Sequence, residues 1–360
     1  MITVGLILTV SLLCAEYLIR KILPQKIFSE IQKTSLNCYQ SSEILAYEYI
    51  PGCESLVGFN GINIPVKINQ SGLRGKEIAA SKNYKRLMLL GDSFVFGYGV
   101  EDSERIGDLV EKQFGNIEVI SAGFLGDAGP DTAYSFLVNR GLDLQPDIIV
   151  LALFPYNDLK DIKETVWKND DGRFAVSSPY KWIDKNGSLR RRETPWRYKF
   201  PIIRDSHFGQ LVIDRLDKAT KLFRTKLSMK LGLWQEGKTQ HELFKNCLYQ
   251  GICQENWLEA STRLGLILDK FQETADKYKI PFLTVIIPLK EQVAGEASQR
   301  TIFHQALENK QIEYLDLTES LRSSGLELSQ LYLPDGHWSA YGHKTAAAAI
   351  SPFILEYLEK

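Results

Sequence analysis

The chain has 360 residues, of which 44% are hydrophobic and 24% are charged. This is the composition of a globular protein, and it excludes a disordered or fibrous chain. The 43 Lys and Arg residues balance the 44 Asp and Glu residues, so the net charge provides no general attraction for nucleic acid. The function must therefore be inferred from a site.

The amino-terminal segment differs from the rest of the chain because residues 2–15 are almost wholly apolar. With the residues that follow, the segment approaches the roughly 20 residues that a membrane-spanning helix needs. Leu12 and Leu13 precede Cys14, so the small residue of a lipoprotein cleavage site is missing. We expect residues 1–21 to form an uncleaved transmembrane anchor. The alternative is a buried helix of the soluble domain.

The orientation of this anchor depends on two conflicting signals. The basic residues after the apolar run would place the following chain in the cytoplasm under the positive-inside rule. They are Arg20, Lys21 and Lys26. The cysteines beyond Cys14 instead form two sequence-local pairs, Cys38 with Cys53 and Cys247 with Cys253, a spacing typical of disulfides in an oxidising compartment. These pairs favour a domain in the periplasm or at the cell surface, with four unpaired thiols as the alternative. No Cys and His spacing predicts a zinc site.

Residues 22–84 are polar and irregular, and we expect this lead to wrap the edge of the following domain. Turn signals occur at Pro51-Gly52, Asn60-Gly61 and Ser71-Gly72, and Val66-Lys67-Ile68 alternates like a strand.

Apolar runs alternate with helical segments in residues 85–160 and 257–360. The expected strands are 86–90, 117–120, 147–154, 282–287 and 312–317. The expected helices are 109–114, 131–143, 257–278, 292–309 and one that begins near 339. Continuous apolar strands that alternate with helices predict a parallel sheet covered on both faces. The fold class is therefore α/β, as a flavodoxin-like three-layer α/β/α sandwich with five strands, and its site should lie at the carboxyl ends of the strands.

Residues 161–256 interrupt this pattern as a long insertion. Tryptophans and a basic run mark it: Trp167, Trp182, Trp196, Trp234 and Arg190 to Arg192. Residues 208–231 could include an amphipathic helix. An insertion at a strand end can form a cap over the site, or it can be a solvated surface excursion.

Ser93 is the candidate nucleophile. It stands in Gly91-Asp92-Ser93, directly after the first apolar strand and before a helix, where its hydroxyl would be exposed. The tripeptide alone is weak evidence because Ser is also a common helix cap. Its position at the start of the sheet makes the functional interpretation stronger.

A nucleophilic serine needs a base and a group that orients the base. Asp335 and His337 follow the last strand, so we expect His337 to be the base and Asp335 to orient it. Asp205-Ser206-His207 has the same spacing, but it lies in the insertion, far from any strand end. His343 is a nearby competitor for the base. His241 and His304 have no comparable setting and are expected to be surface or packing residues.

Four separated blocks of the sequence resemble the SGNH (GDSL-like) hydrolases. The first is Leu90-Gly91-Asp92-Ser93-Phe94, and the second is Ile120-Ser121-Ala122-Gly123. The third is Phe154-Pro155-Tyr156-Asn157-Asp158, and the fourth contains Asp335 and His337. The resemblance covers roughly 45–160 and 258–360. It implies an oxyanion hole formed by Ser93, Gly123 and Asn157, and it requires no metal or organic cofactor.

Two departures from the family pattern bear on the reaction. Pro155 stands where the third block has Gly, and the acid and base are spaced as Asp-x-His-Trp where the family has Asp-x-x-His. The short form is similar to that of envelope proteins that O-acetylate polysaccharides, such as those of alginate modification. The resemblance therefore implies an esterase that acts on an O-acyl ester, for instance of an envelope glycan. The alternatives are an O-acyltransferase for an extracytoplasmic polysaccharide and a non-catalytic glycan-binding scaffold.

Overall fold

The chain divides into two units. The first contains residues Met1–Ser35 and Arg190–Lys238, and the second contains Leu36–Leu189 and Thr239–Lys360. The structure, a computed structural model, describes residues 2–25, 27, 35–59, 62–126, 128–170, 172–191, 200–230, 240–254 and 256–358. Five sequence features lie outside these residues: Lys26, the turn at 60–61, Arg192, Trp196 and Trp234.

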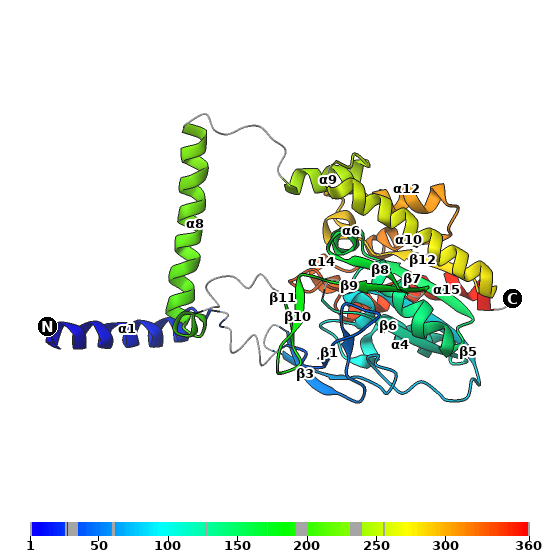
Figure 1. Cartoon of the computed structure of the whole chain (residues 1–360), viewed down its shortest axis with the longest axis horizontal. Coiled ribbons are helices and arrows are strands. Elements are labelled where there is room, and N and C mark those ends of the chain that lie inside the picture. Colours follow the sequence, from blue (N-terminus) through cyan, green and yellow to red (C-terminus); the bar gives the residue numbers. More distant parts are fainter. Residues whose placement is uncertain are drawn as a thin grey trace. The chain divides into compact units, whose positions relative to one another are not determined.

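The second unit is built on a five-stranded parallel sheet (Figure 1). Its strands are β5 (Lys85–Gly91), β6 (Ile117–Gly123), β7 (Ile148–Leu153), β12 (Phe282–Ile286) and β13 (Tyr314–Asp316), in the order β13-β12-β7-β5-β6. All five expected strands are confirmed, and so is the parallel α/β arrangement. The first strand of this sheet along the chain, β5, lies inside the sheet between β6 and β7. The carboxyl ends of these three neighbours therefore lie side by side.

Helices cover both faces of the sheet. Side chains of β5 alternate between two buried clusters, with Met88 and Leu90 in one and Leu87 and Leu89 in the other. The first cluster includes α5 (Pro130–Phe136), α6 (Pro155–Glu164), α10 (Asn256–Tyr278) and α12 (Ile302–Asn309). The second includes α4 (Ile106–Phe114), α13 (Thr318–Arg322) and α15 (Ala340–Leu358). This is the expected three-layer sandwich. The segment expected as a helix over 131–143 is helical, with α5 followed by a π-helix, η2 (Leu137–Gly141), and a 3-10 helix, η3 (Leu142–Leu144).

The single helix expected over 292–309 is wrong. The structure has two helices here, α11 (Lys290–Val293) and α12. Gly295 has a φ of 79°, which a right-handed helix cannot accommodate. Thr301 begins the second helix, because its side chain accepts the N–H of Phe303. The sequence contained both residue types, a glycine that can end a helix and a threonine that can begin one.

The lead before the sheet folds as two short hairpins. β1 (Tyr39–Gln40) pairs with β2 (Glu48–Tyr49), and β3 (Glu54–Phe59) pairs with β4 (Ile62–Lys67). The Cys38–Cys53 disulfide, one of the two expected pairs, forms here. The Tyr49 hydroxyl accepts the N–H of Leu125, which follows β6. The lead is therefore attached to the sheet next to the carboxyl end of β6.

The insertion contains strands that its sequence did not reveal. They are β8 (Val166–Asp170), β9 (Arg173–Ser177), β10 (Lys181–Ile183) and β11 (Leu189–Arg191). Trp167 on β8 donates its indole N–H to the buried carboxylate of Asp131 over 2.7 Å, so this tryptophan is part of the packing. Cys247 on helix α9 (Gln240–Gln250) forms the second expected disulfide with Cys253, just beyond the helix. Whether the insertion caps the site stays a prediction.

The first unit contains α1 (Ile2–Ile22), α7 (Pro201–Arg204) and α8 (His207–Lys230). By length and composition, Thr3–Ile22 is apolar enough to cross a membrane, and it is exposed within the structure. A signal sequence would pass the same test. The amphipathic helix expected over 208–231 corresponds to α8.

Candidate active site

Ser93 is the first residue of α3 (Ser93–Phe96), a single helical turn that follows β5. The Asp92 carboxylate caps this turn by accepting the N–H of Phe94 over 2.9 Å. Gly97 ends it in the left-handed conformation, with φ of 79°. Between these ends Phe94, Val95 and Phe96 are buried, while Ser93 is half-buried. The serine hydroxyl therefore lies at the end of β5, on a turn that the Asp92 cap and the three buried side chains hold in place.

Gly123, the last residue of β6, lets α3 approach the sheet. A Cβ atom at this position would lie only 2.0 Å from the backbone nitrogen of Phe96. Real Cβ atoms do not approach backbone so closely, so this position requires glycine. The register Gly91↔Gly123 places it beside the strand end that leads into Ser93.

Arg74 holds the far end of the nucleophile turn, a role that the sequence did not reveal. Its buried guanidinium donates to the carbonyl oxygens of Phe96, Gly97 and Val100 over 2.6–3.1 Å, and its Nε donates to Asp102 over 2.7 Å. Burial, and then the charge of Arg105, lower the pKa of Arg74 to about 10. It remains a cation at neutral pH. The only sequence signal was an arginine in the Ser71–Gly75 turn.

His337 lies within hydrogen-bond distance of the nucleophile. Its Nε2 is 2.9 Å from Ser93 Oγ, and its Nδ1 is 3.0 Å from Asp335 Oδ2. The other carboxylate oxygen of Asp335 accepts the His337 backbone N–H over 3.2 Å. Gly336 between them has a φ of 95°, which turns the chain back tightly enough for this contact. The short Asp-x-His spacing is therefore sufficient to orient the ring.

Aromatic side chains fix the loop that carries His337. Trp338 is fully buried, with its ring centre 4.9 Å from that of Phe94 on the nucleophile turn. The ring of Tyr98 lies 4.8 Å from the imidazole on another side. This packing connects a loop near the carboxyl end of the chain to a turn 244 residues earlier.

Three electrostatic effects act on the carboxyls of the site. Burial tends to raise the pKa of Asp335, but the hydrogen bonds and charge of His337 outweigh it and leave that pKa below its ordinary value. Burial raises the pKa of Asp92 to about 6, although the Phe94 N–H and the charge of His337 lower it. Burial, followed by the carboxyls of Asp92 and Asp161, raises the pKa of Asp158 well above its ordinary value. Two buried acids with raised pKa values, Asp92 and Asp158, therefore lie close enough to each other to interact electrostatically.

Asn157 lies in the first turn of α6, directly after β7. Pro155 occupies the first helical position, where a proline costs nothing because that N–H has no helical partner. The departure from the family pattern at this position therefore suits the helix start. Within the part of the chain that the structure describes, the Asn157 side-chain amide has no hydrogen-bond partner, and the residue is half-buried. It is free to donate to a ligand.

The other histidines have different surroundings. His343 is fully buried, and burial followed by the charges of Arg105 and Arg74 lowers its pKa to about 3. It is therefore neutral and enclosed. His241 is exposed, and His207 belongs to the first unit.

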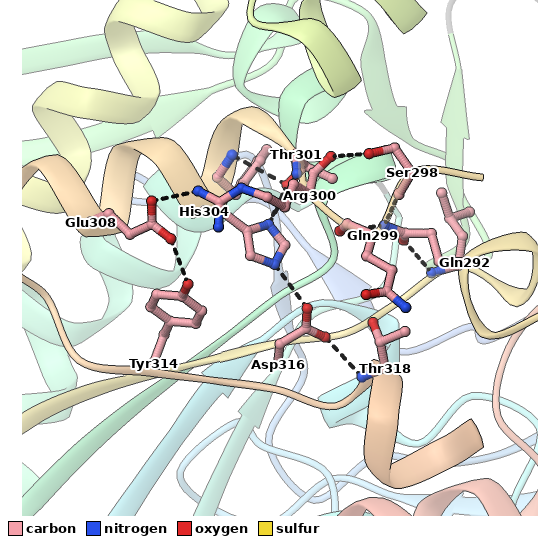
Figure 2. Close-up of polar contacts among 12 residues, drawn as sticks. Gln292, Ser298, Gln299, Arg300, Thr301, His304, Glu308, Tyr314, Asp316 and Thr318 are labelled. Atoms are coloured by element: carbon pink, nitrogen blue, oxygen red, sulfur yellow. Dashed lines mark hydrogen bonds and ion pairs between the residues drawn. The ribbon is translucent and has the colours of Figure 1, made fainter. Parts of the chain in front are cut away.

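His304 is a buried packing residue, one of the two settings expected for it, and its ring has polar partners on both nitrogens (Figure 2). Its Nε2 lies 2.9 Å from Asp316 Oδ2, and its Nδ1 accepts the backbone N–H of Thr301 over 3.1 Å. Thr301 is 1% exposed and caps α12, so its hydroxyl is not accessible to a substrate. This second combination of hydroxyl, imidazole and carboxylate connects α12 to the end of β13 and has a structural role.

Comparison with known proteins gives matches in structure alone. No family model and no curated protein sequence matches the chain. The lipase/acylhydrolase from Enterococcus faecalis is 12% identical over 75% of this chain and 95% of its own, with a TM-score of 0.37. A carbohydrate acetylesterase family member from Sinorhizobium meliloti is 13% identical over 77% and 100%, with a TM-score of 0.32. A lipase from a goat rumen metagenome is 12% identical over 74% and 96%, with a TM-score of 0.39.

These solved structures resemble the chain over about three quarters of its length. Identities and scores this low leave the chemistry to be argued from the chain's own residues. Those residues place a hydroxyl, an imidazole and a carboxylate in series, an arrangement that can move a proton from oxygen to nitrogen and hold the resulting imidazolium. Among the described residues, no group of three His, Cys, Asp or Glu side chains could hold a metal ion.

Proposed function

We propose that this protein is a serine-dependent ester hydrolase of the SGNH type. The observation that carries the proposal is the continuous series Ser93 Oγ, His337 and Asp335, with contacts of 2.9 and 3.0 Å. A serine hydroxyl is a weak nucleophile until a base within hydrogen-bond reach accepts its proton. The series provides this base together with a carboxylate that orients it.

In the proposed reaction, Ser93 Oγ attacks the carbonyl carbon of an ester while His337 Nε2 accepts its proton. The carbonyl oxygen becomes an oxyanion, for which the Ser93 N–H, the Gly123 N–H and the Asn157 amide are the proposed donors. Each such donor lowers the barrier by about 3 kcal/mol. The tetrahedral intermediate then expels the alcohol, which takes the proton from His337. Water, deprotonated by the same histidine, releases the acid and restores Ser93.

The substrate class that we propose is an O-acyl ester of a cell-envelope glycan. This substrate class is supported by the location outside the cytoplasm that the chain's own features favour. Two disulfides suit an oxidising compartment, and an apolar amino-terminal helix suits attachment at the membrane. We therefore propose a membrane-anchored protein whose catalytic unit is extracytoplasmic. Thiol titration without reductant should find Cys14 alone; five reactive thiols would contradict this location.

The nucleophile is tested with the full chain in detergent. Wild-type protein should release nitrophenol from p-nitrophenyl acetate, and a fluorophosphonate should label it at Ser93. Ser93→Ala should lose both signals. Ser103→Ala, which removes an exposed hydroxyl from η1 (Asp102–Glu104), is the matched control and should keep both. Full activity in Ser93→Ala would refute the assignment, and a wild type without either signal would favour a non-catalytic glycan-binding scaffold.

A second candidate is O-acyl transfer to a polysaccharide, with the same residues and a sugar hydroxyl in place of water. The compact Asp335-Gly336-His337-Trp338 block favours it, because this spacing is similar to that of envelope proteins that O-acetylate polysaccharides. Hydrolysis and transfer differ in product. With an acyl donor and an oligosaccharide acceptor, mass spectrometry would find an acylated sugar only if transfer occurs.

A further inference from the structure

The start of α8 is fixed to α1 by hydrogen bonds to one carboxylate. Glu16 on α1 accepts the N–H of His207 over 3.0 Å, the N–H of Phe208 over 2.9 Å and the hydroxyl of Ser206 over 2.8 Å. A carboxylate is stabilised at a helix amino terminus because the first N–H groups have no helical partner. The His207 ring also accepts the N–H of Gln25, just beyond α1. These contacts place the first residues of α8 beside Glu16 of α1.

That position lies near one end of the apolar span. Glu16 is six residues before Ile22, the last residue of α1. At 1.5 Å per residue, it lies about 9 Å inside the end of the helix. Helices that lie in a membrane surface bury their apolar face about 5–10 Å into the boundary between headgroups and acyl chains. If α1 crosses the bilayer, α8 begins at this depth.

Among the side chains of α8 whose burial the structure describes, the buried ones lie in the first turns. His207, Gln210 and Ile213 are at most 5% exposed, whereas beyond them Leu216 is 57% exposed and Phe223 is 66% exposed. Figure 1 shows the helix leading away across the direction of α1. A helix that leaves a span in this direction runs along a membrane surface and does not enter the bilayer core.

The exposed apolar side chains of α8 share one face. Val212, Leu216 and Phe223 are spaced four and seven residues apart, which places them on one stripe of a helix. The helix is basic overall, because its six Lys and Arg residues outnumber its two acidic residues, Asp214 and Asp217. Its basic residues are Arg215, Lys218, Lys221, Arg224, Lys226 and Lys230. An apolar stripe on a basic helix is the pattern of helices that bind anionic lipid surfaces.

We propose that α8 is an interfacial helix that binds the surface of a bilayer containing anionic phospholipids. Val212, Leu216 and Phe223 enter the boundary between headgroups and acyl chains, and the basic side chains contact lipid phosphates. The proposal rests on α1 as the membrane span and does not depend on the reaction at Ser93. It gives the protein a second membrane attachment, which orients the first unit on the bilayer.

The test places spin labels in the full chain reconstituted into vesicles. Cys14 is the one cysteine outside the disulfides, so Cys14→Ser provides a background for single labels. The labelled positions are Leu216→Cys and Phe223→Cys, with Lys218→Cys as the control. Two residues correspond to 200° around a helix, so Lys218 lies almost opposite Leu216.

Accessibility to oxygen, which partitions into lipid, and to a water-soluble nickel chelate gives the depth of each label. We expect oxygen to relax the labels at 216 and 223 more strongly, and the nickel chelate to relax the label at 218 more strongly. The difference should be larger with phosphatidylglycerol in the vesicles than with phosphatidylcholine alone. Equal accessibility at all three positions would overturn the proposal. Protection at 216 and 223 from both reagents would overturn it too, because protein would then cover the stripe.

Two further measurements identify the cause of a failure. A label on native Cys14 should be accessible to oxygen only; access to the nickel chelate would refute the span and the proposal with it. Arg215→Gln with Lys218→Gln should reduce the dependence on phosphatidylglycerol, whereas Lys344→Gln, which removes an exposed charge from α15 in the other unit, should not. An unchanged dependence in the double variant would refute the role of the basic side chains.

Discussion

The buried carboxylate of Asp92 lowers the stability of the fold at neutral pH. Replacing it with a neutral side chain should therefore make the protein more stable. The burial of this carboxyl raises its pKa from 3.8 to about 6. One of its oxygens, Oδ1, caps the nucleophile turn, while Oδ2 is buried without a hydrogen-bond partner in the described structure. Asp92→Asn keeps the cap, because Asn is as good a cap as Asp. It removes the buried charge.

The magnitude follows from the pKa shift. A group whose pKa is raised on folding is neutral in both states at low pH, so it has no effect there. As the pH rises from about 4 to about 6, the unfolded chain loses this proton first and the folded state becomes less stable. The shift is about two pH units, and each unit corresponds to 1.36 kcal/mol, so the cost at pH 7 is about 3 kcal/mol. We expect Asp92→Asn to gain up to this amount.

The assay is urea unfolding of the full chain in detergent, followed by tryptophan fluorescence between pH 4 and pH 8. The gain in the free energy of unfolding should be largest above pH 6 and small at pH 4. Asp335→Asn is the matched control with the opposite sign, because the pKa of Asp335 is lowered. Its carboxylate stabilises the fold above its unfolded pKa, and this contribution is lost as the pH falls. Asp335→Asn should therefore be less stable than wild type at pH 7.

An Asp92→Asn variant with wild-type stability at pH 7, or with the same gain at pH 4, would refute this reasoning. We also expect the variant to have a lower kcat, because an ionised Asp92 helps to stabilise the imidazolium of His337. A gain in stability together with a loss in activity would indicate that the buried acid is retained for the reaction.

Three other substitutions distinguish the roles of neighbouring residues. Gly123→Ala should lose about 1–3 kcal/mol of stability, the usual cost of overpacking, because its Cβ would meet the backbone of Phe96; a wild-type urea midpoint would contradict this. Asn157→Ala should lower kcat by about 10²–10³ if its amide binds the oxyanion, with KM nearly unchanged. His343→Gln should keep the wild-type pH profile of kcat, and a loss of the profile would make His343 the base in place of His337.

The sequence predicted all five strands of the sheet. For most strand ends, the predicted and observed positions differ by no more than about two residues. A strand buried on both faces is a continuous apolar run, such as Ile148–Leu153, and its flanking glycine or proline marks the end. The same logic placed Ser93 and His337 at strand ends, and the structure brings their side chains within 2.9 Å. The parallel topology accounts for the position of Ser93, because it collects the carboxyl ends of the strands at one edge. His337 reaches the same place from a loop after α14 (Leu328–Leu331), well beyond the end of β13.

What the sequence could not show depends on burial and on long-range contacts. Asp92 was visible as part of a tripeptide, but its raised pKa follows from the side chains that enclose it. Arg74 looked like part of a surface turn, yet its guanidinium donates to carbonyls more than 20 residues away. Neither effect has a local pattern, since each depends on what the fold places around the side chain.

The first unit also contains features whose roles depend on a long-range contact that the sequence could not show. Residues 161–256 were one insertion by sequence position, but the structure assigns Arg190–Lys238 to the first unit and the rest of the insertion to the second. Glu16 was an acidic residue near the end of an apolar run, and Ser206-His207 was a coincidental repeat of the spacing around Asp335. The structure brings these two features together, because a carboxylate on an apolar helix needs donors and a helix start needs an acceptor. A charge within an apolar helix is expensive in a membrane unless it is paired. The pairing of Glu16 with α8 therefore gives both features one explanation, which the spin-label measurement tests directly.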